Sequence, residues 1–174
     1  MSFLAFLLLF SAGISFAYSN KPKEIKYGHI EIQSITPAIS TVKKISHNIT
    51  STKPGIKITV KENNNDAEMI QRMLEGNVDI IIASRDMNDD EEAIAKEYNI
   101  SYKKLPFAIS KDDTNQIYYM YINDMNYNHK PQNKVFAKNY YGEDRSLVVT
   151  TDVNPLPDEE YNKVIDYLKL IDEF

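Results

Sequence analysis

The chain has 174 residues, of which 43% are hydrophobic and 26% are charged, a composition typical of globular rather than disordered or fibrous proteins. Its formal net charge is −5, with acidic and basic residues interspersed, so no basic surface is expected that could neutralise the phosphates of a nucleic acid. Cysteine is absent, which excludes disulfides, thiolate metal sites and lipid-modified cysteines. The length suits one domain and is too short for two α/β domains of ordinary size.

Residues 1–17 form an apolar run that ends in Ser15-Phe16-Ala17, directly before a polar segment. Small residues at the last and third-last positions of such a run suit signal peptidase, whereas an uncleaved membrane anchor would be the alternative. The run is shorter than the roughly 20 residues that span a bilayer. We therefore predict a signal peptide at 1–17, and a mature chain, 18–174, that is exported to the periplasm or the extracellular space and is not an integral membrane protein.

Hydrophobic periodicity predicts that strands and helices alternate through the first part of the mature chain. Thr36 and Pro37 are expected at the N-cap and N1 positions of the first helix, and Asn65 or Asp66 at the N-cap of the second. The nearly continuous apolar run 78–83 is typical of a central parallel strand covered on both faces. Strands are expected at 24–33, 56–60, 78–83 and 102–107, with helices from 36, 66 and 89. This order predicts an α/β fold: a single three-layer lobe, residues 18–174, with a mainly parallel sheet flanked by helices.

A Tyr- and Asn-rich excursion is expected at about 115–145, with a strand at 117–122. A further short strand is expected at 147–151, before a terminal helix. The excursion contains six of the chain's twelve tyrosines. These are interpreted either as an antiparallel strand pair that covers the sheet or as a contact surface for another protein, since tyrosine is enriched at interfaces.

Three segments, in order, resemble the phosphate-binding solute receptors of ABC transporters, which have the type II periplasmic-binding-protein fold. They are Ser34-Ile35-Thr36-Pro37, the strand 56–60 with its polar loop, and the run 77–87 with its Ala83-Ser84-Arg85 end. The resemblance covers about residues 25–122. It implies phosphate or a similar small oxyanion as ligand, and a transporter as partner.

In a doubly wound sheet, the ligand lies beyond the carboxyl ends of the parallel strands, where helix N-termini favour anions. The predicted oxyanion-binding residues are Ser34, Thr36, Asn64, Asn65, Asp66, Ser84 and Arg85. Each also has a structural explanation: Ser34 and Thr36 as helix caps, and Arg85 in a surface ion pair with Asp86 or Asp89.

Two departures from the family bear on the ligand. The family's Gly-rich loop is replaced by Asn63-Asn64-Asn65-Asp66, in which the carboxylate of Asp66 stands where the anion would meet the helix. The second lobe of a two-lobed receptor is predicted to be missing, because only about forty residues separate Phe107 from Val148. Half a cleft excludes water from an anion less well than a closed one.

No catalytic motif, metal-ligand spacing or cofactor signature is found in the sequence. We therefore predict a binding module and not an enzyme, with no metal and no cofactor. The leading hypothesis is an exported, solute-binding-like module that binds an oxyanion weakly or has lost that ability. The alternative is an envelope or extracellular interaction domain that keeps the fold and contacts another protein.

Overall fold

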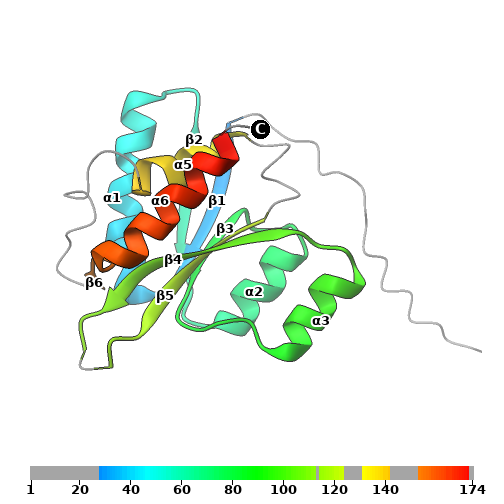
Figure 1. Ribbon diagram of the computed structural model, residues 1–174. Coiled ribbons are helices and arrows are strands. Elements are labelled where there is room, and N and C mark those ends of the chain that lie inside the picture. Colours follow the sequence, from blue (N-terminus) through cyan, green and yellow to red (C-terminus); the bar gives the residue numbers. More distant parts are fainter. Residues whose placement is uncertain (1–27, 113, 124–130, 142–152, 173–174) are drawn as a thin grey trace, which may run out of the picture.

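A six-stranded sheet with helices on both faces organises the chain (Figure 1). The computed structural model describes residues 28–112, 114–123, 131–141 and 153–172. The signal peptide expected at 1–17 and the strand expected at 147–151 lie outside these residues. The strands are β1 His29–Ser34, β2 Lys57–Glu62, β3 Ile80–Ala83, β4 Tyr102–Ser110, β5 Ile117–Asn123 and β6 Val153–Asn154. The helices are α1 Thr36–Thr52, α2 Asp66–Leu74, α3 Asp89–Glu97, α5 Pro131–Tyr141 and α6 Asp158–Asp172.

The strand order is β2-β1-β3-β5-β4-β6. Strands β2, β1 and β3 pair in parallel, whereas β5 is antiparallel to both of its neighbours, and β6 is antiparallel to β4. The α/β class with helices around one sheet is thus confirmed, but the sheet is mixed rather than mainly parallel. The Tyr-rich strand β5 causes the difference, because it enters the sheet between β3 and β4 instead of covering it.

The helices form two layers. Helix α1 packs on β1 and β2 and contacts α5, which in turn contacts α6, while α2 and α3 pack together on the other side of the sheet (Figure 1). The apolar stripe of α1 explains its placement, because Val42, Ile45 and Ile49 are fully buried. Strand β3 is buried at every position, as a central strand covered on both faces must be.

The tyrosines of the excursion belong mainly to the core. Tyr118, Tyr121, Tyr140 and Tyr141 are buried, and the ring of Tyr140 stacks on Phe107 with centroids 4.2 Å apart. A buried hydroxyl needs a partner, and those of Tyr140 and Tyr141 donate to the carbonyl oxygens of Phe107 and Pro106. These side chains therefore hold α5 against β4 and are not available as a contact surface.

The described residues form one sheet with its covering helices, and a second lobe is not formed among them. Within the same residues, no helix is long and apolar enough to cross a membrane.

Candidate anion-binding site

The carboxyl ends of β1, β2 and β3 lie at one edge of the sheet because these three strands are parallel. Ser34, the last residue of β1, pairs with Glu62 of β2 on one side and with Ile82 of β3 on the other. The backbone N–H of Asn63 donates to the carbonyl oxygen of Ser34 at 2.9 Å. The loops that lead into α1, α2 and α3 therefore start next to one another.

Thr36, at the start of α1, presents a backbone N–H and a hydroxyl to the loop that follows β2. The N–H donates to Oδ1 of Asn64 at 2.8 Å, and the hydroxyl donates to Oε1 of Glu62 at 2.5 Å. The hydroxyl also accepts from Nδ2 of Asn64 at 2.8 Å. Thr36 is not the N-cap that its sequence position predicted, since that place is taken by Ile35. Its helix terminus is capped instead from another loop.

Asp66, the first residue of α2, reaches across to the end of β3. One carboxylate oxygen accepts from the backbone N–H of Ser84 at 3.0 Å, and the other accepts from the Ser84 hydroxyl at 2.5 Å. The N-cap of α2 is Asn65, whose Oδ1 accepts from the N–H of Glu68 at 3.2 Å. Of the two predicted caps, Asn65 is correct, and Asp66 is engaged with β3.

Arg85 follows Ser84 and forms a bidentate ion pair with Glu91 of α3, with N–O distances of 2.7 and 2.8 Å. The hydrogen bonds that Arg85 donates to Glu91 raise the pKa of the Arg85 guanidinium and lower the pKa of the Glu91 carboxyl. The charge of Asp66 also raises the pKa of Arg85. The expected partners, Asp86 and Asp89, do not hold the guanidinium with their carboxylates, although Arg85 does donate to the carbonyl oxygen of Asp86 at 2.7 Å.

A buried tyrosine anchors the loop that carries Arg85. The hydroxyl of Tyr121 donates to Oδ1 of Asp86 at 2.6 Å and accepts from the backbone N–H of Met87 at 3.3 Å. The ammonium group of Lys104 pairs with the same carboxylate and lies 4.3 Å from the ring centroid of Tyr119. Strands β4 and β5 thus fix the start of α3, and with it the position of Arg85.

The structure brings together five of the seven predicted oxyanion-binding residues: Thr36, Asn64, Asp66, Ser84 and Arg85. Ser34 does not join them, because it is fully buried and its hydroxyl donates to the carbonyl oxygen of Ile35 at 3.2 Å. Asn65 is used as a helix cap.

Sequence reasoning missed Glu62 and Glu91, the acceptors for Thr36 and Arg85. Glu91 had a usable signal, since it lies at the third helical position after Asn88 and completes a capping box. Glu62 had none, because its partner lies 26 residues away.

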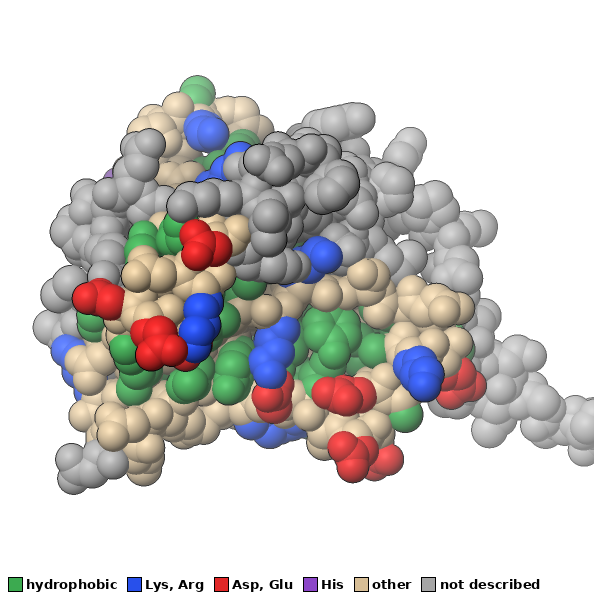
Figure 2. Space-filling model, viewed as in Figure 1, with side chains coloured by type: hydrophobic (Ala, Val, Ile, Leu, Met, Phe, Trp, Pro, Cys, Tyr) green, Lys and Arg blue, Asp and Glu red, His purple; other side chains and the backbone are tan. Residues whose placement is uncertain are grey.

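The charges at this edge are unbalanced. Glu62, Asp66 and Glu91 contribute three carboxylates, whereas the guanidinium of Arg85, which pairs with Glu91 and is influenced by the charge of Asp66, contributes one positive charge. On the face of the molecule seen in Figure 2, acidic and basic side chains are interspersed, with hydrophobic side chains between them. In the described part of the chain, no group of three or more His, Cys, Asp or Glu side chains is arranged to hold a metal ion.

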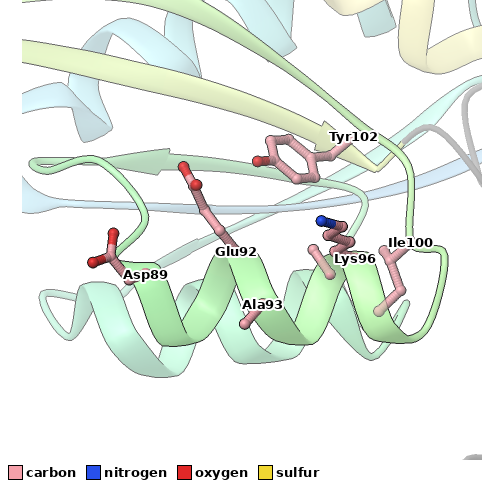
Figure 3. Close-up of a pocket in the computed structure, with 7 residues that line it drawn as sticks. Asp89, Glu92, Ala93, Lys96, Ile100 and Tyr102 are labelled. Atoms are coloured by element: carbon pink, nitrogen blue, oxygen red, sulfur yellow. The ribbon is translucent and has the colours of Figure 1, made fainter.

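A separate open groove of about 490 Å³ lies between α3 and the start of β4 (Figure 3). Glu92 and Lys96 of α3 point toward the ring of Tyr102, and Ala95 and Ile100 contribute apolar lining. Burial, with a further contribution from the negative charge of Glu92, raises the pKa of Tyr102. None of the predicted oxyanion-binding residues lines this groove.

No protein-family model and no curated protein matches the chain significantly. Among solved structures, a possible phosphate binding protein from Planctomyces limnophilus is similar over 48% of this chain and 29% of its own, with 20% identity and a TM-score of 0.45. An ABC-type phosphate transport receptor from Vibrio cholerae is similar over 48% and 31%, with 17% identity and a TM-score of 0.39.

The regulatory domain of MexT, a transcriptional activator in Pseudomonas aeruginosa, is similar over 48% of this chain and 37% of its own, with 14% identity and a TM-score of 0.37. The matched part of this chain therefore spans less than two fifths of each of these proteins. A partial likeness of this extent, shared by transport receptors and a transcription regulator, does not identify a ligand. That question depends on the contacts at the sheet edge.

Proposed function

We propose that this chain is a non-enzymatic binding module. It binds a small oxyanion, with phosphate as the representative ligand, at the carboxyl ends of the parallel strands β1, β2 and β3. One observation carries the proposal: Thr36 and Ser84 each present a backbone N–H together with a hydroxyl at this edge, and the Arg85 guanidinium, which follows Ser84, is close enough to Asp66 for the charge of Asp66 to raise its pKa. Backbone N–H groups at helix starts, hydroxyls and a guanidinium are the donors that proteins use for oxyanions. The proposal agrees with the resemblance of the sequence to phosphate receptors.

Binding at this edge is weak in the proposal, because every donor already has an acceptor within the chain. An oxyanion must displace Asn64 or Glu62 from Thr36 and Asp66 from Ser84, and it then lies near like charges. The edge also belongs to a single lobe, so water keeps access to the ligand. We expect a dissociation constant in the millimolar range, about 1 to 10 mM, which is equivalent to roughly 3 to 4 kcal/mol of binding free energy.

Acid–base chemistry is not part of the proposed function. The hydroxyls of Thr36 and Ser84 donate to carboxylates, and no imidazole of the described part of the chain contacts them. His29 stands at the amino end of β1, at the opposite edge from Ser34, and its Nε2 bonds to Thr59 at 2.9 Å. Among the described residues, neither hydroxyl of the candidate site is therefore paired with a histidine base, as the nucleophile of a Ser–His acyl-transfer enzyme is.

The proposed location is outside the cytoplasm, on the strength of the signal-peptide pattern in residues 1–17. The alternative of a Tyr-based interaction domain has no observation in its favour, because the tyrosines of β5 and α5 are mostly buried.

The test is thermal unfolding of residues 18–174 across a titration with phosphate at constant ionic strength. At 50 mM phosphate and a dissociation constant of about 5 mM, the native state gains about 1.4 kcal/mol. The midpoint should then rise by about 3 to 6 °C. Chloride at the same ionic strength should leave it unchanged.

Arg85→Gln should abolish most of the phosphate-dependent rise. Lys53→Gln is the matched control, since Lys53 is an exposed cation at the far end of α1. A midpoint that does not respond to phosphate, or that responds equally in both variants, would overturn the proposed function.

A further inference from the structure

The connection from the end of β2 to the start of α2, residues 62–66, supplies the acceptors for the donors of Thr36 and Ser84, and every second residue takes part. Glu62 and Asn64 bond to Thr36, and Asp66 bonds to Ser84. The N–H of Asn65 donates to Oδ1 of Asn63 at 2.9 Å, which helps to fix the loop between them. Residues 62–66 thus reach the residues that follow β1, the neighbour of β2, and those that follow β3, one strand further along the sheet.

The contact between Asp66 and Ser84 has the form of a bound oxyanion. The two carboxylate oxygens of Asp66 each accept from one donor of Ser84, the backbone N–H at 3.0 Å and the hydroxyl at 2.5 Å. Its negative charge acts on Arg85, whose pKa it helps to raise, after the larger effect of Glu91. A carboxylate is a planar anion with two acceptor oxygens, so it can use the same donors as a phosphate oxygen pair.

We infer that Asp66 is a built-in competitor of the external oxyanion and is the residue that sets its affinity. The inference rests on the proposed function and adds the reason why the site is weak. Two effects combine at Asp66. It occupies the donors of Ser84, and its charge repels any anion that approaches Arg85.

Asp66 differs from Glu62 and Asn64, the other two acceptors in residues 62–66. Asn64 is neutral and adds no repulsion. Glu62 is exposed and takes only the hydroxyl of Thr36, leaving the backbone N–H to Asn64. Of these three acceptors, Asp66 is the one that combines a negative charge with both donors of one residue, so its replacement should have the largest effect.

The test compares Asp66→Asn with the parent chain in a phosphate titration followed by amide ¹H–¹⁵N spectra, which also report whether each variant is folded. Asparagine keeps the shape and one acceptor for the Ser84 N–H, but it removes the charge and frees the hydroxyl. The dissociation constant for phosphate should fall at least tenfold, with the largest shifts at Thr36, Ser84 and Arg85. Asp66→Ala serves as a second variant and should give the same direction.

The matched control is Glu68→Gln, which removes the same formal charge from the first turn of the same helix. Its side chain is exposed, and its backbone N–H is already capped by Asn65. This control should change the affinity less than twofold.

The outcomes separate the two proposals. If the parent chain binds phosphate at these amides and Asp66→Asn binds no more tightly than Glu68→Gln, the role of Asp66 is wrong and the proposed function stands. If neither the parent chain nor any Asp66 variant responds to phosphate, both are wrong.

Discussion

Removal of one hydroxyl, in Tyr121→Phe, should loosen the loop that positions Arg85. Tyr121 is fully buried, and its hydroxyl both donates to Asp86 and accepts from the backbone N–H of Met87. Phenylalanine fills the same space but leaves the buried N–H without its partner. The loss of a hydrogen bond to a charged group and the unsatisfied N–H together cost about 2 to 3 kcal/mol of unfolding free energy.

Urea unfolding measures this loss directly. For a domain of this size, the expected change lowers the midpoint by about 1 to 2 M at an unchanged slope. Tyr119→Phe is the matched control on the same strand, because Tyr119 is only half-buried and its hydroxyl has no hydrogen bond among the described residues. It should change the unfolding free energy by less than about 0.5 kcal/mol. Equal midpoints for the two variants would refute the anchoring role of Tyr121.

Three further predictions concern charge, backbone and core. The hydrogen bonds from Arg85 lower the pKa of Glu91 below its usual 4.5, so this pair stabilises the fold above that value and the contribution is lost as the pH falls through the folded pKa. Glu91→Gln should therefore reduce stability at neutral pH and flatten its fall between about pH 5 and 3; identical pH profiles for parent and variant would contradict this. Gly28→Ala should destabilise by at least about 1 kcal/mol, because φ is +100° and a Cβ would overlap the carbonyl oxygen of Gly55. Gly55→Ala, which meets nothing within 4 Å, should be nearly neutral in the same denaturation assay. Ile81→Ala, in the fully buried β3, should cost about 2 to 5 kcal/mol by calorimetry, and a loss below about 1 kcal/mol would argue against its central position.

Local sequence patterns were sufficient to predict most elements of the first half of the fold. The apolar stripe of α1, the alternation in β2 and the continuous apolar run of β3 each depend on residues close together in the chain. The prediction of a helix from 89 agrees with α3 at Asp89–Glu97. Acidic residues at its start and the capping box of Asn88 are local signals of the same kind.

The place of β5 in the sheet could not be predicted from such patterns. Its residues read as a strand, but strand order depends on pairing between distant segments, and Ile80 pairs with Ile122 across 42 residues. The tyrosines illustrate the same limit. Their composition fits an interface as well as a core, and only the packing of Tyr140 on Phe107 and the burial of Tyr121 decide for the core.

The candidate site was predicted in its location but not in its contacts. The parallel order of β1, β2 and β3 was enough to bring Thr36, Asp66 and Ser84 to one edge. The pairing of Asp66 with Ser84 across 18 residues was not foreseen, because a side chain at a helix start is expected to cap its own helix. Ser34 was lost from the site for a related reason, since the last residue of a central strand is buried.

The central claim is that the start of α1 and the end of β3 form one anion site that the chain's own acceptors occupy. The most direct test is the amide ¹H–¹⁵N spectrum of the parent chain, titrated with phosphate at constant ionic strength. The account predicts saturable shifts at Thr36 and Ser84 with one shared dissociation constant of about 1 to 10 mM. Shifts confined to other residues, or none at these two amides up to 50 mM phosphate, would contradict it.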